Sequence, residues 1–337
     1  MDAARYNITV DIVVLLLSTS DILVDMTKHK SRVIAVPFYR QRGFKLFLMV
    51  LPFMILVFLF AYFPLYGWVY AFFNYKPGVP LTGRFVGLKN FFTIIQDRYA
   101  VAEVLRVLRN TFGISGLNML VTPLPMIFAI YLSELRFSPF KKVVQTLTTI
   151  PNFISWILVY AVAYAMFSVG DGFVNRLLIA FGITDAGFNF LASPSHIWIK
   201  MMLWGIWKGL GWGAIIYFAA LSSIDQELYE AARVDGAGRF MRIWHITVPG
   251  LLPTYFVLLI LSFANFLNNG MEQFFVFQNP MTKSSVEVLD LYVYNQGIAG
   301  TKYSYSIAIS MLKSIISLVL LFTANGLSKL IRRESIF

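Results

Sequence analysis

The feature that most constrains this chain is a series of long apolar segments separated by polar ones. The clearest covers residues 46–73 and contains no charged residue. A helix needs about 20 mostly apolar residues to cross the hydrocarbon core of a bilayer, so this segment predicts a transmembrane helix. Five further segments have the same character, at residues 111–132, 146–169, 197–221, 249–269 and 303–327. The sequence therefore predicts an all-α integral membrane protein with six transmembrane helices.

Composition agrees with a membrane protein and argues against a nucleic-acid-binding one. The chain is 58% hydrophobic and 13% charged, whereas soluble domains carry about 25% charged residues. Its formal net charge is +11, but the basic residues flank the apolar segments instead of forming one face. The simpler explanation is that basic loops of a membrane protein face the cytoplasm.

Basic clusters predict where the two ends of the chain lie. Residues 1–45 contain one apolar run, residues 8–17, which is interrupted by Asp11 and too short to span a bilayer. Basic residues then gather before the first apolar segment: Lys28, Lys30, Arg32, Arg40, Arg42 and Lys45. The last apolar segment is followed by Lys329, Arg332 and Arg333. We therefore expect a cytoplasmic or interfacial arm over residues 1–45, a membrane domain over 46–330 and a cytoplasmic tail over 331–337.

Motifs for catalysis or cofactor binding do not occur in the sequence. The chain has no cysteine, so it has neither a disulfide framework nor a thiolate site. His29, His196 and His245 are scattered and have no partner at helical spacing. The phosphate loop GxxxxGKS/T and the catalytic patterns GxSxG and HExxH are absent as well. We therefore expect a chain that is not an enzyme and that holds no cofactor, metal or ATP of its own.

The polar segment 222–248, between the fourth and fifth apolar segments, has a regular internal pattern. Leu228, Ala231 and Ala232 fall at i, i+3 and i+4, which places them on one side of a helical turn. The two alanines give that side a flat surface that another protein can approach closely. Gly236 then permits a backbone turn that a Cβ would hinder. The pattern predicts a docking helix; the alternative is an amphipathic helix lying on the lipid surface.

A longer motif in this segment resembles that of a known family. Glu-Ala-Ala is followed after three residues by Gly and, after nine more, by Ile-x-x-Pro. This spacing resembles the EAA loop of binding-protein-dependent ABC importer permeases, with one departure at Val248, where the family usually has Leu. By this resemblance, the residues that couple the chain to an ATPase are Glu230, Ala231, Ala232, Asp235, Gly236, Ile246 and Pro249.

The resemblance implies a type I ABC importer permease in a bacterial inner membrane, with both ends of the chain and the EAA coupling helix on the cytoplasmic side. Its partners would be a second permease, expected to be a related chain, and two ATPases that bind ATP and Mg. A periplasmic or extracellular solute-binding protein would deliver the substrate. Closure of the ATPases would move the coupling helix and switch the permease between outward and inward access.

Three segments outside the apolar runs carry the resemblance to sugar importers. Residues 85–91 and 171–175 resemble segments of sugar permeases, and residues 288–294 resemble the subgroup that handles oligosaccharides and polysaccharides. Alginate or its oligosaccharides are the first expectation for the substrate, followed by simple oligosaccharides. The outer segment 74–110 is basic, which would suit an acidic polysaccharide, although it departs from the rule that basic loops lie inside.

Two sets of side chains are candidates for the substrate path. The first is an aromatic set at i, i+4 and i+8, on which sugar rings could stack: Trp156, Tyr160 and Tyr164. The second is a polar set at the same spacing, which could line an aqueous path: Asn265, Asn269 and Gln273. For both sets the alternative is structural, as packing or hydrogen bonding between helices.

An ion-coupled secondary sugar transporter is the alternative function. Such a transporter would use ionisable groups within the spans, and the candidates are Lys208, Lys313 and Glu272. No carboxylate lies deep in an apolar segment, however, and such a transporter needs no EAA loop. A lysine at membrane depth is costly, so Lys208 is expected to face a partner, a cavity or the second permease. Small residues on the same segment predict close packing, within the chain or between subunits: Gly205, Gly209 and Gly213.

Overall fold

The structure is a computed structural model that describes residues 42–81 and 84–332 of the chain. The expectations for the tail, and for all but the end of the N-terminal arm, lie outside these residues. Within them every regular element is helical, and the only extended pairing is an isolated antiparallel bridge between Phe73 and Phe85. The prediction of an all-α protein is therefore confirmed.

The described residues up to Tyr66 form one compact unit, and the chain from Gly67 onward forms a second. The first unit holds α2 (Arg42–Val57), the π-helical turn η2 (Phe58–Tyr62) and the start of the 3-10 helix η3 (Phe63–Phe72). Together Gly43–Phe72 is a 30-residue stretch long and apolar enough to cross a membrane, and none of its most apolar window is buried against protein. This is the surface expected of a helix that lies in lipid.

The second unit begins with α3 (Lys89–Gln96), α4 (Arg98–Leu120) and α5 (Leu124–Ser133). The Asp97 carboxylate caps α4 by accepting a hydrogen bond from the Tyr99 N–H at 2.9 Å. Pro125 in the first turn of α5 follows a short break, and Arg98–Ser133 as a whole qualifies as a membrane span. The helix therefore begins well before the predicted start at residue 111.

The predicted span over residues 146–169 is not one continuous helix. The chain forms α6 (Ser138–Thr149), the 3-10 turn η4 (Ile150–Phe153) and α7 (Trp156–Phe167), and the two halves meet at 109°. Pro151 lacks an N–H to continue the helix. Ile154 is extended with ψ of 136°, and the Ser155 hydroxyl then caps α7 by accepting from the Leu158 N–H. A helix α8 (Phe173–Ala180) follows.

Helix α9 (Ile197–Ser222) spans 26 residues and packs against α4, α5 and α6. Two of its glycines make these contacts possible. A Cβ on Gly211 would lie 2.3 Å from the backbone of Thr148, and one on Gly213 would lie 3.2 Å from Pro125. Gly205 and Gly209, in contrast, have no neighbour within 4 Å of such a Cβ. The small-residue face therefore serves packing within the chain at Gly213 and is open at the other two positions.

The predicted span 249–269 has different bounds. The candidate span in this region is a continuous helical stretch of 26 residues, Arg239–Ala264. It follows α10 (Gln226–Val234) and consists of α11 (Arg239–Arg242), η5 (Ile243–Thr247) and α12 (Val248–Ala264). The helix ends at Asn265, whose N–H bonds to carbonyls of the last turn.

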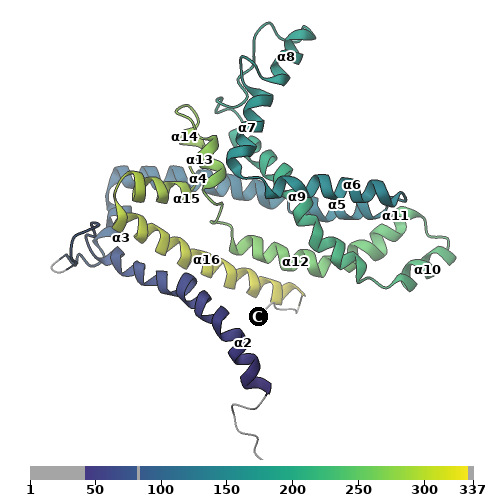
Figure 1. Ribbon diagram of the computed structural model, residues 1–337, viewed down its shortest axis with the longest axis horizontal. Coiled ribbons are helices and arrows are strands. Elements are labelled where there is room, and N and C mark those ends of the chain that lie inside the picture. The colour runs from purple at the N-terminus through teal and green to yellow at the C-terminus, as the bar shows by residue number, and fades with distance from the viewer. Residues whose placement is uncertain (1–41, 82–83, 333–337) are drawn as a thin grey trace, which may run out of the picture. The chain divides into compact units, whose positions relative to one another are not determined.

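Residues 274–303, which lie between the last two predicted spans, contain further short helices. These are α13 (Glu272–Phe277), which begins just before this range, α14 (Lys283–Val286), α15 (Leu289–Tyr294) and the π-helical turn η6 (Asn295–Ala299). Leu289, Leu291 and Tyr292 are almost fully buried, so this segment belongs to the core. The last helix, α16 (Tyr303–Arg332), runs beside α12 (Figure 1).

Four of the described helical stretches are long and apolar enough to cross a membrane, and five if the bent pair α6–α7 counts as one span. The remaining predicted span is α9, which is long enough but does not reach the same apolarity within the described residues. Length and composition therefore support a multi-span membrane protein without reproducing the predicted number of six.

Candidate functional site

The residues of the Glu-Ala-Ala motif lie on α10, whose ends are fixed by local hydrogen bonds. The Asp225 carboxylate accepts from the Glu227 N–H at 3.0 Å and caps the N-terminus. At the other end Gly236 has φ of +78°, and the Ala237 N–H bonds back to the Ala232 carbonyl at 2.8 Å. This is the left-handed helix ending that glycine favours. No atom lies within 4 Å of a Cβ built on Gly236, so the backbone conformation, and not space, calls for glycine.

Apolar side chains of this segment are unusually exposed. Helix α10 has no buried residue, and Glu230, Ala231 and Asp235 are exposed while Ala232 is half-buried. Val234 is 89% exposed and Leu228 is 54% exposed. Past the turn, Phe240 and Trp244 are 76% and 70% exposed. Exposed apolar side chains grouped in this way occur both at protein-docking surfaces and at surfaces that face lipid.

The segment is tied to the helices around it by a few specific contacts. The hydroxyls of Tyr229 and Thr247 lie 2.9 Å apart, and Arg239 Nε donates to Glu134 Oε2 at 2.8 Å. The other two residues of the predicted motif lie at the start of the following span: Ile246 is half-buried and Pro249 occupies the first turn of α12. These contacts therefore fix α10 and its exposed side chains to the neighbouring helices.

The aromatic set of α7 divides between packing and exposure. Trp156 and Tyr160 pack against a buried core cluster, and the Tyr160 ring meets Phe277 edge-on at 5.1 Å. The Tyr160 and Tyr164 rings lie 6.5 Å apart, and Tyr164 is 58% exposed. The three residues share a helix as expected, but only Tyr164 has more than half of its surface exposed.

The prediction that Asn265, Asn269 and Gln273 share one helical face is wrong, because α12 ends at Ala264 and α13 begins only at Glu272. Asn265 bonds within its own helix, to the Leu261 carbonyl. Each of the other two bonds to a different element, Asn269 to Ser115 on α4 at 2.9 Å and Gln273 to the Met201 carbonyl on α9 at 2.7 Å. These contacts match the alternative, hydrogen bonding within and between elements.

Lys208, the lysine expected at membrane depth, faces the bend between α6 and α7. Its ammonium donates to the carbonyl oxygens of Pro151, Asn152 and Ile154 at 3.2, 2.7 and 2.6 Å. It also lies 5.5 Å from the centre of the Trp156 ring, a cation–π distance. The partners of Lys208 are therefore three backbone carbonyls of the bend, of which that of Pro151 also accepts from the Ile154 N–H at 3.2 Å.

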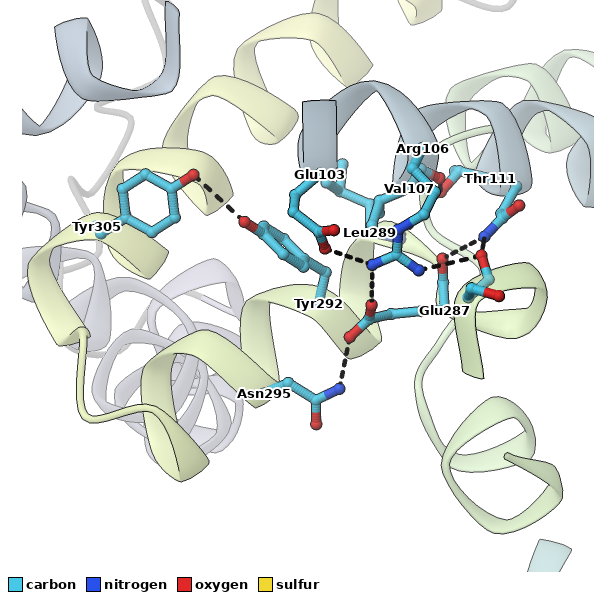
Figure 2. A network of polar contacts seen from close by, with 11 residues as sticks. Glu103, Arg106, Val107, Thr111, Glu287, Leu289, Tyr292, Asn295 and Tyr305 are labelled. Atoms are coloured by element: carbon cyan, nitrogen blue, oxygen red, sulfur yellow. Dashed lines mark hydrogen bonds and ion pairs between the residues drawn. The ribbon is translucent and has the colours of Figure 1, made fainter. Parts of the chain in front are cut away.

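A partly buried polar network joins α4 to the segment before α15 (Figure 2). Arg106 donates to Glu287 Oε2 at 2.7 Å and to Glu103 Oε2 at 2.5 Å. The other Glu287 oxygen accepts from Asn295 at 2.7 Å, and the Glu287 side chain is only 4% exposed.

Two further contacts hold the backbone of the same segment. The Thr111 hydroxyl accepts from the Leu289 N–H at 2.9 Å. Tyr292 shares a hydrogen bond with Tyr305, and burial, followed by this hydrogen bond, raises the pKa of the Tyr292 phenol. That phenol therefore stays protonated and the contact persists.

The sequence did not reveal a second ionic contact, between Lys313 on α16 and Asp290 on α15. The pair lines a cavity of about 750 Å³ together with Tyr294, Ser306 and Ser310. The second Asp290 oxygen accepts from the Gly270 N–H at 2.9 Å. Asp290 lies 23 residues before Lys313, a separation at which no periodic pattern indicates a pair. A cluster of three or more acidic or histidine side chains able to hold a metal ion is not found in the described part of the chain.

Comparisons with known proteins agree with this architecture. Residues 121–333 match the family model described as binding-protein-dependent transport system inner membrane component. Protein LplB of Bacillus subtilis (strain 168) is 37% identical over 294 residues, 87% of this chain and 91% of its own length. The polygalacturonan/rhamnogalacturonan transport system permease protein YteP of the same organism is 36% identical over 312 residues, 92% of this chain and 95% of its own.

Two solved structures have a similar fold. One is a bacterial ABC transporter involved in the import of the acidic polysaccharide alginate, with a TM-score of 0.76, 32% identity and coverage of 86% of this chain and 97% of that one. The other is a bacterial alginate ABC transporter in complex with an alginate pentasaccharide-bound periplasmic protein, with a TM-score of 0.78, 30% identity and coverage of 89% and 100%. This chain therefore belongs to the inner membrane components of binding-protein-dependent transport systems, the permeases of ABC importers.

Proposed function

We propose that this chain is the permease subunit of an ATP-driven importer for acidic oligosaccharides or polysaccharides, with alginate or its oligosaccharides first. The family gives the importer class. Among the relatives, YteP is named for polygalacturonan and rhamnogalacturonan, and the similar structures are of transporters that import alginate. All of these polymers contain acidic sugars, which favours an acidic glycan over a neutral one.

The exposed face of α10 is the observation that carries the proposed mechanism. Leu228 and Val234 are apolar and unpartnered on a helix whose ends are firmly fixed. A short helix of this kind, with Glu230 and Ala231 exposed beside them, suits a groove on a separate ATPase chain. Movement of that ATPase would then pass through α10 to α11 and α12, which continue the chain after one turn.

The substrate path is proposed along the aromatic face of α7 and the cavity beside α15 and α16. Tyr164 offers an exposed ring for stacking, and Trp156 and Tyr160 lie on the same helix. The cavity supplies hydroxyls from Ser306, Ser310 and tyrosines, and the Lys313 ammonium stands beside them. Hydroxyl partners suit a sugar, and a carboxylate on that sugar would share the Lys313 ammonium with Asp290, which pairs with it in the same cavity.

The partners follow from the same proposal. A second permease would complete the pathway, two ATPases would dock at the α10 faces and a solute-binding protein would deliver the glycan. The chain itself would be non-catalytic, with ATP and Mg bound by the ATPases. Both ends of the chain would lie on the side of the membrane that carries α10.

The test compares two glycines of the coupling segment. Gly236→Asp forces a side chain onto φ of +78°, whereas Gly238→Asp falls at φ of −66°, the N-cap of α11, and both positions are open. A left-handed conformation costs a non-glycine residue about 1–3 kcal/mol. We expect ATP hydrolysis stimulated by loaded binding protein, measured on the reconstituted assembly, to fall at least about tenfold for Gly236→Asp and to change little for Gly238→Asp.

Equal activity of both variants would contradict a coupling role for this turn. Uptake into ATP-free vesicles under an ion gradient would instead establish the ion-coupled alternative. Binding of alginate, polygalacturonate and neutral oligosaccharides to the cognate solute-binding protein tests the substrate separately. A preference for neutral sugars would overturn the acidic-glycan proposal and leave the importer mechanism in place.

A further inference from the structure

An arginine-lined cavity beside α10 has no role in the proposed function. It has a volume of about 820 Å³, within the range of small-molecule sites. Its walls come from the end of α5 and the turn after it, the end of α9, α10, and the stretch from α11 to η5. Its charged lining consists of four arginines and one glutamate: Arg136, Arg233, Arg239, Arg242 and Glu134.

The positive charge of this cavity is mostly unbalanced. The Glu134 carboxylate is engaged by Arg239, whose Nε lies 2.8 Å from it. Arg136, Arg233 and Arg242 have no side-chain ion pair within residues 42–81 and 84–332. The Nε–H of Arg242 is moreover buried and without a hydrogen-bond acceptor. A buried donor left unpaired costs free energy, and an anion in the cavity would remove that cost.

The position of the arginines relative to the apolar helices indicates where such an anion comes from. Arg239 and Arg242 lie in the first turns of the candidate span Arg239–Ala264. Phe240 and Trp244 on the same turns are 76% and 70% exposed. Aromatic residues at the end of a span lie at headgroup level, and basic pockets between helices at that level bind anionic lipid headgroups.

We propose that this cavity binds a phosphate group, supplied by the headgroup of an anionic phospholipid on the membrane face that carries α10. Guanidinium groups hold phosphate through paired N–H donors, and the hydroxyls of Tyr229 and Thr247 lie in the same wall. Arg233 lies on α10, Arg242 ends α11, and Arg136 lies in the turn between α5 and α6. A bound phosphate therefore ties α10 and α11 to that turn.

The test measures lipid retention, which needs neither transport nor the acidic-glycan substrate. The full-length chain, with the subunits that co-purify with it, is placed in nanodiscs of phosphatidylcholine with graded phosphatidylglycerol, and retained lipid is counted by native mass spectrometry. We expect the wild type to retain phosphatidylglycerol from nanodiscs that contain about tenfold less of it than the double variant Arg136→Gln/Arg242→Gln requires. The reason is that the variant loses charge-assisted hydrogen bonds. Neither residue has an ion pair within the described residues, so the variant loses no salt bridge, and equal melting temperatures of the two proteins check that it folds.

Two controls separate this site from general charge effects and from other sources of phosphate. Arg98→Gln/Arg109→Gln removes two exposed arginines of α4 and is expected to retain phosphatidylglycerol as the wild type does. Displacement of the lipid by millimolar inorganic phosphate supports recognition of the phosphate itself. Binding of inorganic phosphate without a preference for phosphatidylglycerol assigns the site to a soluble phosphate compound.

Three results would overturn the proposal. Equal lipid retention by the wild type and the cavity variant, together with no binding of inorganic phosphate, would show that the cavity has no anion. Equal losses in the cavity variant and the α4 control would reduce the effect to net charge. Loss of the co-purifying ATPase from the cavity variant, with lipid retention unchanged, would make these arginines a protein-docking surface.

Discussion

At the scale of single residues, Lys208 explains how a lysine is accommodated within an apolar region. Its three hydrogen bonds go to carbonyls of one bend and not to a carboxylate. A bend of 109° interrupts the helical hydrogen bonding, and carbonyls at a helix end carry partial negative charge. The ammonium and the carbonyls of the bend therefore stabilise each other.

This mutual dependence predicts a large effect of removing the ammonium. Lys208→Met should lower the free energy of unfolding by about 2–3 kcal/mol, since hydrogen bonds to a charged group contribute about 1.5–3 kcal/mol. Lys200→Met is the matched control on the same helix, because Lys200 makes one such bond, to the Ser193 carbonyl at 2.9 Å, and should cost about half as much. Thermal unfolding in detergent measures both. A smaller loss for Lys208→Met than for Lys200→Met would contradict the role assigned to the bend.

At the scale of elements, the sequence predicted helices where apolar runs were long and failed where tertiary contacts decided. The prediction for residues 46–73 agrees closely with the helical stretch Gly43–Phe72, because one local property fixes it. The helical spacing of Asn265, Asn269 and Gln273 was misleading, because it assumed that α12 continued through all three. The helices within residues 274–303 are too short to show a clear period, and it is their contacts with α4, α7, α9 and α16 that make them part of the core.

The contacts of α4 with the segment between α14 and α15 can be tested at one carboxylate. Glu287→Gln should lower the free energy of unfolding by about 2–3 kcal/mol, because Arg106 then keeps its charge in a half-buried place with a weaker partner. Glu103→Gln is the control, since Glu103 bonds to the same Arg106 nitrogen but its side chain is 51% exposed. That variant should lose less than about 1 kcal/mol. Chemical unfolding of both would refute the assignment if the two losses were equal.

At the scale of the whole molecule, the unsettled feature is whether α9 crosses the membrane. Its 26 residues extend about 39 Å at 1.5 Å per residue, longer than the roughly 30 Å of a hydrocarbon core. Its low apolarity stems partly from Lys200 and Lys208, and hydropathy counts both as free charges. Both ammonium groups are bonded to carbonyls of the chain, which removes much of the cost that hydropathy assigns to them. We therefore expect α9 to span.

Single cysteines test this directly, because the chain contains none of its own. Ser195→Cys precedes α9 and Ser223→Cys follows it, and both positions are exposed. A membrane-impermeant maleimide should label them from opposite sides of oriented vesicles, and Ala231→Cys on α10 should be labelled from the same side as Ser223→Cys. Labelling of Ser195→Cys and Ser223→Cys from one side would make α9 re-entrant.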